Sequence, residues 1–427
     1  MAESRRSPWA WIPSLYFAEG LPYVVVMTVS VILYKGLGVS NTEIALYTSW
    51  LYLPWVIKPL WSPLVDIVRT KRAWIVAMQL LIGAGLGGVA LTLPADDFLR
   101  WSLVFLWLVA FSSATHDIAA DGFYMLGLSA HQQAWFVGVR STFYRLAMIT
   151  GQGLLVMLAG FIADRSGDVR YGWVITFYVL AGAFGLFCLY HAWVLPRPAA
   201  DDVRRLGGWR ELVAEFVRTF LSFFRKEHVG VALAFLLLFR FAEAQLVKLA
   251  APFLLDDRAV GGLGLSTAEV GFVYGTVGML LLTLGGILGG ILAARNGLKY
   301  WLWWMVAAIN LPNIVYVVLA LLQPEAFWVV NLAVAVEQFG YGFGFTAYML
   351  YMIYFSRGEH ETAHFAICTG FMALGMMLPG MVSGWLQELM GYRTFFFWVM
   401  AATIPSFIVA ALIPLRGDFG RKEDVAG

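Results

Sequence analysis

Three ionisable side chains crowd into one segment of an otherwise apolar run, residues 112–125 (SSATHDIAADGFYM). His116, Asp117 and Asp121 lie within six consecutive positions, with FLRWSLVFLWLVAF before the segment and LGL after it. A charged side chain at the centre of a bilayer costs ~2.5–3.5 kcal/mol even on the scale most tolerant of charge. These groups therefore need counter-charges, water or a proton, which are the components of an ion or substrate pathway.

The spacing of the polar residues places them on one side of a helix. Ser113, Asp117 and Asp121 recur at i, i+4 and i+8 and so form a stripe. Such a stripe can face a wet cavity and exchange protons, or it can pair with neighbouring bases in a purely structural role. Both interpretations stay open for each acid.

Two arginines in the next apolar run are candidate partners for carboxylates. Arg145 is followed by LAMITGQGLLVMLAG and so lies deep in the span, which favours recognition of a substrate carboxylate. Arg140 lies nearer the start of the run and can equally extend toward the membrane surface. A catalytic dyad or metal site at His116 and Asp117 is not indicated, because no third ligand or nucleophile occurs at usable spacing.

The composition is that of a membrane protein built from helices. The 427 residues are 60% hydrophobic and only 13% charged, with a mean hydropathy of +0.74, whereas a soluble domain carries about 25% charged residues. The two cysteines lie in apolar runs, so neither a disulfide framework nor a thiolate metal site is expected. We expect no cofactor and no nucleic-acid partner. The first apolar run is too long for a signal peptide and carries Glu19.

The apolar runs predict an all-α protein that crosses the membrane twelve times. The predicted spans are approximately 10–35, 42–61, 73–93, 98–125, 133–162, 171–194, 229–255, 267–292, 300–322, 326–354, 362–387 and 393–415. The polar, arginine-rich connection 195–228 separates two six-helix halves, 1–194 and 229–427, and Trp209–Phe224 has the amphipathic spacing of a surface helix. The basic residues concentrate in the connections that lie on the same side of the membrane as the N-terminus. Basic connections are typical of the cytoplasmic side, so both termini are expected in the cytoplasm.

An internal repeat supports the division into halves. Three pairs of segments match at offsets of 224 to 226 residues: FAEGL (17–21) with FAEAQ (241–245), GLGVSNTEIALYTS (36–49) with GLGLSTAEVGFVYG (262–275), and DGFYM (121–125) with FTAYM (345–349). Two parallel six-helix repeats with a site between them are typical of the major facilitator superfamily. The same offset makes Glu243 the mate of Glu19 and places Glu337 opposite Ser113.

Two cytoplasmic connections resemble the signature of that superfamily, G-x-L-A-D-R-x-G-x-K/R. GILAARNGLK (290–299) departs from it only at Ala294, whereas SPLVDIVRTKR (62–72) keeps the acid and a basic end. An acid at a helix end that pairs with bases on its neighbours can latch one conformation. The predicted latch comprises Asp66, Arg69, Arg72 and Arg295; the alternative is ordinary positive charge on cytoplasmic loops.

More narrowly, the chain resembles the peptide–acetyl-coenzyme A transporter family, which includes the AmpG-type muropeptide permeases. The resemblance rests on LYFAEGLPY (15–23), IKPLWSPLVD (57–66) and ATHDIAADGFY (114–124), and is clear in the N-terminal half. His116 replaces the usual glutamine, and Gly122 and Phe123 stand where alanine and tyrosine are common.

The resemblance implies a proton-coupled transporter of a bacterial inner membrane that imports muropeptides or their disaccharide core, GlcNAc-anhydroMurNAc. Acetyl-coenzyme A or another anionic metabolite is the alternative cargo, and a membrane sensor that moves nothing is the alternative function. The sequence contains no P-loop, so an ATPase is not indicated, and it contains no catalytic constellation that would indicate another enzyme. The expected partners are an anionic sugar-peptide, protons and lipid, and the expected state is a monomer.

The candidate residues fall into two groups. Proton coupling is assigned to Asp117, Asp121 and Glu337. Substrate binding is assigned to Glu19, His116, Tyr124, Arg140, Arg145 and Glu243.

Overall fold

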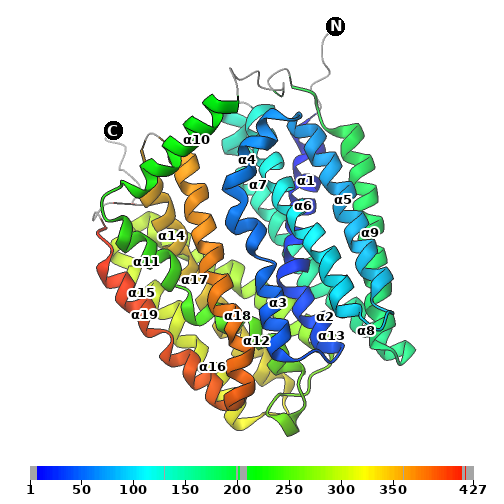
Figure 1. Ribbon diagram of the computed structural model, residues 1–427. Coiled ribbons are helices and arrows are strands. Elements are labelled where there is room, and N and C mark those ends of the chain that lie inside the picture. The colour runs from blue at the N-terminus through cyan, green and yellow to red at the C-terminus, as the bar shows by residue number, and fades with distance from the viewer. Residues whose placement is uncertain are drawn as a thin grey trace. The chain divides into compact units, whose positions relative to one another are not determined.

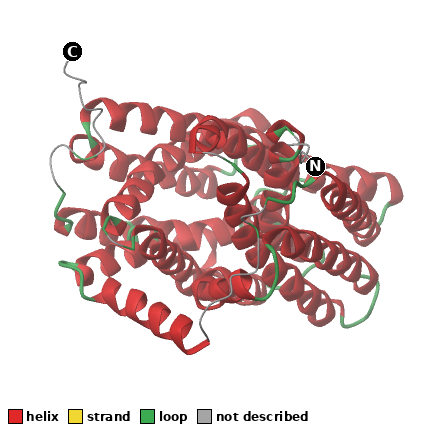
Figure 2. Ribbon diagram, turned by 90° about the horizontal axis from the view of Figure 1, so that it is seen from above, coloured by secondary structure: helices red, strands yellow, loops and turns green. Residues whose placement is uncertain are grey.

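The computed structural model describes residues 7–128, 130–198, 201, 209–358, 360–415 and 419. Every regular element in these ranges is a helix, as Figure 2 shows, and the predicted all-α architecture is confirmed. The chain divides into two compact units. Unit 1 comprises Met1–Leu37 and Ile57–Val213, and unit 2 comprises Gly38–Val56 and Ala214–Gly427.

Unit 1 is a bundle in which α5 packs against α6 and α9, α1 packs against α7, and α8 packs against α9. Its elements are η1 (Pro8–Ala10), α1 (Ile12–Val24), the π-helical η2 (Val25–Val29), α2 (Ser30–Gly36), α4 (Leu53–Ile67, from Ile57), α5 (Lys71–Thr92), α6 (Phe98–Gly127), α7 (Ala130–Ile149), the π-helical η3 (Thr150–Leu155), α8 (Val156–Ser166) and α9 (Val169–Val194).

Unit 2 contains the rest of the helices together with α3, which lies beside α18 in Figure 1. Its elements are α3 (Asn41–Trp50), α10 (Trp209–Phe224, from Ala214), α11 (Val229–Leu238), α12 (Phe241–Leu255), η4 (Arg258–Val260), α13 (Thr267–Val270), the π-helical η5 (Gly271–Gly278), α14 (Met279–Asn296), α15 (Leu298–Asn310), η6 (Leu311–Asn313), α16 (Ile314–Leu322), α17 (Phe327–Ser356), α18 (Glu361–Ala401) and α19 (Ile404–Leu412).

Nine helical segments of the described chain are long and apolar enough to cross a membrane. The last of them, Ala363–Leu412, covers two predicted spans and is broken at Gly391, whose φ of 73° is not helical. The predicted span 326–354 corresponds to α17. The predicted span 42–61 is divided between α3 and α4.

The division between α3 and α4 has a local cause. Ser40 caps α3 by accepting a hydrogen bond from the backbone N–H of Glu43, and the helix ends at Leu51. Pro54 occupies the second position of α4, where its missing N–H costs nothing. The apolar run is therefore continuous in sequence while the helix restarts within it.

The predicted helix Trp209–Phe224 forms with the expected bounds. Phe223 is fully buried, with its ring 5.5 Å from that of Phe355 and 6.2 Å from that of Phe371. Val217 and Leu221 on the same helix are 44% and 48% exposed. One side of this helix thus packs against other residues of unit 2, and the apolar side with Val217 and Leu221 remains partly exposed.

Helices α14 and α17 approach so closely that only glycine fits between them. A Cβ atom at Gly342 would lie 1.9 Å from the carbonyl oxygen of Leu282, and one at Gly285 would lie 2.1 Å from that of Phe339. Small residues let two membrane helices bring their backbones into contact, where van der Waals packing replaces the missing hydrophobic force.

Replacing Gly342 by alanine is therefore expected to force α14 and α17 apart. We expect Gly342→Ala to lower the free energy of unfolding by about 1–3 kcal/mol, the usual cost of overpacking, measured by thermal unfolding of the purified protein. The matched control is Gly290→Ala on α14, where a Cβ meets nothing within 4 Å. Equal melting temperatures for the two variants would contradict this interpretation of the contact.

Candidate functional site

Three carboxyl groups meet inside unit 1. Glu19 comes from α1, and Asp117 and Asp121 come from α6. One carboxylate oxygen from each lies within 4.8 Å of the other two. We call these three residues the acid cluster. Like charges at this distance repel strongly outside bulk water, so the cluster requires cations or protons.

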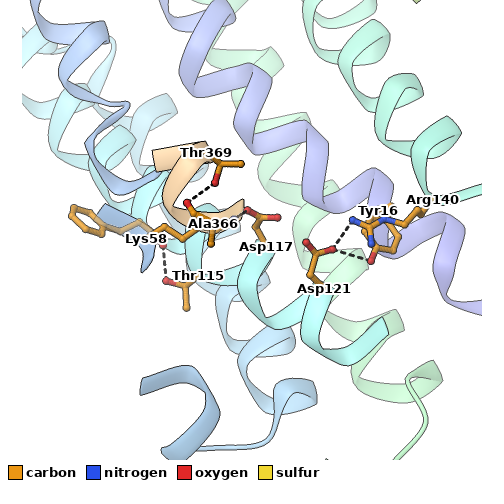
Figure 3. Close-up of polar contacts among 9 residues, drawn as sticks. Tyr16, Lys58, Thr115, Asp117, Asp121, Arg140, Ala366 and Thr369 are labelled. Carbon is orange, nitrogen blue, oxygen red and sulfur yellow. Dashed lines mark hydrogen bonds and ion pairs between the residues drawn. The ribbon is translucent and has the colours of Figure 1, made fainter. Parts of the chain in front are cut away.

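Two cations face the acid cluster (Figure 3). Lys58 of α4 forms an ion pair with Asp117. Arg140 of α7 donates to Asp121 Oδ1 at 2.7 Å, and the same oxygen accepts a hydrogen bond from the Tyr16 hydroxyl at 3.2 Å. Both acids predicted on one stripe are therefore paired, each with a different helix.

Aromatic rings fix the position of Arg140. Its guanidinium carbon lies 4.4 Å from the centre of the Tyr16 ring and 5.1 Å from that of Tyr124. Cation–π contacts of this kind hold a guanidinium that would otherwise extend to the membrane surface. The contact of Tyr124 with Arg140 places this predicted residue beside the acid cluster.

The acid cluster has one more acid than it has paired cations. Lys58 and Arg140 balance two negative charges, whereas the cluster has three carboxyl groups. Glu19 is the most buried of the three, at 6% exposed, and among the described residues its Oε2 atom has no hydrogen-bond partner. The side chains of Lys58 and Asp117 keep 22% and 20% of their surface exposed, so the cluster is not sealed.

His116 faces away from the acid cluster. Its Nε2 atom lies 3.0 Å from Gln79 Nε2, whose Oε1 lies 3.0 Å from His191 Nδ1. His191 Nε2 in turn lies 2.9 Å from Ser14 Oγ. This polar chain joins α6, α5, α9 and α1, and both histidines are fully buried. His116 thus sits one residue from Asp117 but points into the bundle.

Arg145 is not paired within the part of the chain that the structure describes. It is half-buried on α7, and no hydrogen bond or ion pair joins it to another residue in the described ranges. The charges of Asp117 and Asp121 are met by Lys58 and Arg140 instead. Arg145 is therefore not the counter-ion of either acid in this structure.

Glu243 and Glu337 have different surroundings in unit 2. Glu243 forms a buried ion pair with Arg240, with Nε–Oε2 and Nη2–Oε1 distances of 2.7 and 2.6 Å. Arg240 also donates to the Tyr341 hydroxyl at 2.7 Å. Glu337, 4% exposed, accepts a hydrogen bond of 2.8 Å from Gln338. The repeat mates Glu19 and Glu243 thus differ, since only Glu243 has a direct basic partner among the described residues.

The predicted acid–base latch stays a prediction, because it depends on Asp66 and the structure describes only part of the chain. The side chain of Asp66 lies outside that part. Arg69 and Arg295 are exposed. Arg72 donates to the carbonyl oxygens of Leu195 and Ala192, at the end of α9.

Asp201, which was not predicted from the sequence, binds the N-terminus of α5 close to Arg72. Its carboxylate accepts hydrogen bonds from the backbone N–H groups of Lys71 at 2.7 Å and Arg72 at 3.1 Å. A carboxylate at a helix N-terminus satisfies free donors and opposes the helix dipole. Nearby, a Cβ at Gly122 would lie 2.9 Å from Lys71 Cε, so glycine leaves room for this lysine.

Comparison with known proteins agrees with this architecture. Residues 14–363 match the model of the Major Facilitator Superfamily. The chain belongs to this superfamily. Membership indicates a multi-pass membrane transporter, and it confirms the superfamily predicted from the repeat.

Individual relatives are more distant. The chain is 26% identical over 417 residues to the anhydromuropeptide permease of Escherichia coli K12, covering 96% of this chain and 80% of that protein. It is 23% identical over 407 residues to the putative transporter AmpG 4 of Rickettsia conorii, covering 92% and 94%.

Solved structures show the same fold. The crystal structure of a D-xylose–proton symporter matches with a TM-score of 0.71 at 13% identity, covering 96% of this chain and 98% of that one. A bacterial homologue of the human lysosomal transporter Spinster matches with a TM-score of 0.66 at 16% identity, covering 96% of both chains.

Removing Lys58 is expected to destabilise the protein through its partner. Lys58→Met strands the carboxylate of Asp117, and we expect a loss of about 1–3 kcal/mol because a partly buried charge then lacks compensation. Lys58→Met with Asp117→Asn is expected to recover most of this loss in thermal unfolding. Arg100→Met, which removes an exposed pair with Asp97, is the control and should change stability by less than about 0.5 kcal/mol. A double variant as unstable as Lys58→Met would refute the pairing argument.

Proposed function

We propose that the protein is a proton-coupled importer of anionic cell-wall fragments, muropeptides or GlcNAc-anhydroMurNAc, in a bacterial inner membrane. The observation that carries proton coupling is the excess of carboxyl groups over paired cations in the acid cluster. Electrical balance in a low-dielectric bundle is reached when one of the three carboxyl groups holds a proton.

The acid cluster has the parts that a proton carrier needs. Glu19 is buried and incompletely hydrogen-bonded, which favours its neutral form, while Asp117 and Asp121 each have a cation that favours the carboxylate. The partial exposure of Lys58 and Asp117 gives protons a route to the cluster. Release of the proton would then make the net charge of the acid cluster more negative by one unit. This change would favour one arrangement of α1 and α6, the helices that carry the cluster, over another. Glu337, which is buried in unit 2, is a second candidate for the proton carrier.

The substrate assignment rests on the relatives and on Arg145. The relative that covers 96% of this chain is named for anhydromuropeptides. Muropeptides carry carboxylates, and the guanidinium of Arg145, which has no partner among the described residues, is suited to bind one in a bidentate manner. Import requires the orientation inferred from the basic connections, with both termini in the cytoplasm.

Neutralising Glu19 is expected to separate transport from its driving force. Glu19→Gln resembles the protonated side chain and cannot release its proton, so pH-driven accumulation of a radiolabelled muropeptide in proteoliposomes should be abolished. Exchange of internal for external ligand without a gradient should persist. Glu325→Gln, at an exposed position, is the matched control and should behave as the wild type. Accumulation at the wild-type ratio in Glu19→Gln would remove the coupling role, and absence of any counterflow in the wild type would remove the transporter.

Arg145 is expected to distinguish acids from amides. Arg145→Gln should weaken binding of a carboxylate-bearing muropeptide by about 1.5–3 kcal/mol, the range for a hydrogen bond to a charged group, and should leave the amidated analogue nearly unchanged. Isothermal titration calorimetry of the purified protein gives both constants. Equal losses for the acid and the amide would leave Arg145 with a structural role only.

A further inference from the structure

A lysine at the centre of α12 has no counter-ion among the described residues. Lys248 is the middle residue of Phe241–Leu255 and is 1% exposed. No ion pair joins it to an acid among the residues that the structure describes. Because it lies seven residues from either end of the helix, its side chain cannot reach the membrane surface.

The contacts that the described residues make with the ammonium group of Lys248 are with neutral groups. Its Nζ atom donates to Thr48 Oγ1 at 2.9 Å and lies 5.1 Å from the centre of the Tyr52 ring. Thr48 donates its own hydroxyl proton to the carbonyl oxygen of Ile44 at 2.6 Å, so its oxygen serves Lys248 as an acceptor. Both contacts come from α3 and the turn that follows it.

Hydrogen-bond donors exceed acceptors around this group. An ammonium has three N–H donors, and one finds an acceptor in the described ranges. Ser49 Oγ is also buried without a partner among these residues. Both groups flank Gly380 of α18, since a Cβ there would lie 2.7 Å from Ser49 Oγ and 3.4 Å from Lys248 Cγ. Within the described residues, the surroundings of Lys248 Nζ therefore lack a group that is rich in hydrogen-bond acceptors.

Arg240 is another buried cation of unit 2, and its hydrogen-bond donors have partners. It begins α12, and Glu243 and Tyr341 satisfy it within hydrogen-bond distance. Burying a cation without such compensation is strongly unfavourable. A buried lysine without such compensation can also lose its proton. Lys248 is therefore either an uncharged amine in this arrangement or a cation whose partner is not among the described residues.

We propose that Lys248 is a binding residue for a carboxylate of the transported substrate, whose oxygens replace Thr48 on Nζ. This inference rests on the proposed function and deepens it. The buried position implies that α3 must release its contact with α12 before the anion binds, so the site is available in one state of α3 only. Before the anion binds, the face of the Tyr52 ring stabilises the ammonium group.

The test compares an acid with its amide. The probes are GlcNAc-anhydroMurNAc-tripeptide and its analogue with every carboxylate converted to an amide, titrated against the purified full chain. Lys248→Met should weaken binding of the acid ~10-fold or more, as expected for one charge-assisted hydrogen bond, and that of the amide less than ~3-fold. Lys248→Arg should recover part of the loss. Lys299→Met, at an exposed position, is the matched control and should change neither constant.

A second variant keeps Lys248 in place and so guards against misfolding. Thr48→Val removes the competing acceptor, and affinity for the acid should rise ~3-fold while that for the amide stays constant. Equal losses for the acid and the amide in Lys248→Met, or no rise for the acid in Thr48→Val, would overturn the inference. A wild type that binds neither probe would instead overturn the proposed function.

Discussion

The burial of charge in an apolar bundle is the constraint on which the rest of this structure depends. Asp117 and Asp121 lie on one helix, and their counter-charges come from two others, so α4, α6 and α7 are tied by the pairs Lys58–Asp117 and Arg140–Asp121. In membrane helices the hydrophobic effect does not distinguish one apolar face from another. Ion pairs and close glycine contacts therefore select which faces meet, and here the pairs also bring Asp117 and Asp121 together with Glu19.

Helical spacing predicted the face of α6 but not the helices opposite it. Asp117 and Asp121 are correctly placed on one stripe, because the periodicity of a helix is a local property. The pairing of Lys58 with Asp117 depends on how α4 lies against α6, and no local pattern encodes that. The pair Tyr16 and Glu19 is the exception: their i, i+3 spacing in LYFAEGLPY puts both on the side of α1 that faces the acids.

Connections and helix breaks were the least predictable parts. One apolar run, 42–61, becomes α3 and α4 because Pro54 favours a new helix start, and the first piece packs with α18. Asp201 caps α5 from a distance of 130 residues in sequence, which composition cannot indicate. The expectation that Asp66 and its neighbouring arginines form a latch remains a prediction, while Arg72 is engaged with the end of α9.

The chain of polar groups behind His116 has a direction. The Gln79 carbonyl oxygen accepts a hydrogen bond from His191 Nδ1, and the Gln79 amide nitrogen donates one to His116 Nε2. The Ser14 hydroxyl lies 2.9 Å from His191 Nε2 and 3.3 Å from the carbonyl oxygen of Trp11. Because the Gln79 amide has an acceptor oxygen and a donor nitrogen, it joins two imidazoles that both carry their proton on Nδ1. Replacement of one member reverses or interrupts the order and leaves a buried polar atom unpaired. Positions 79, 116 and 191 are therefore expected to vary together among relatives.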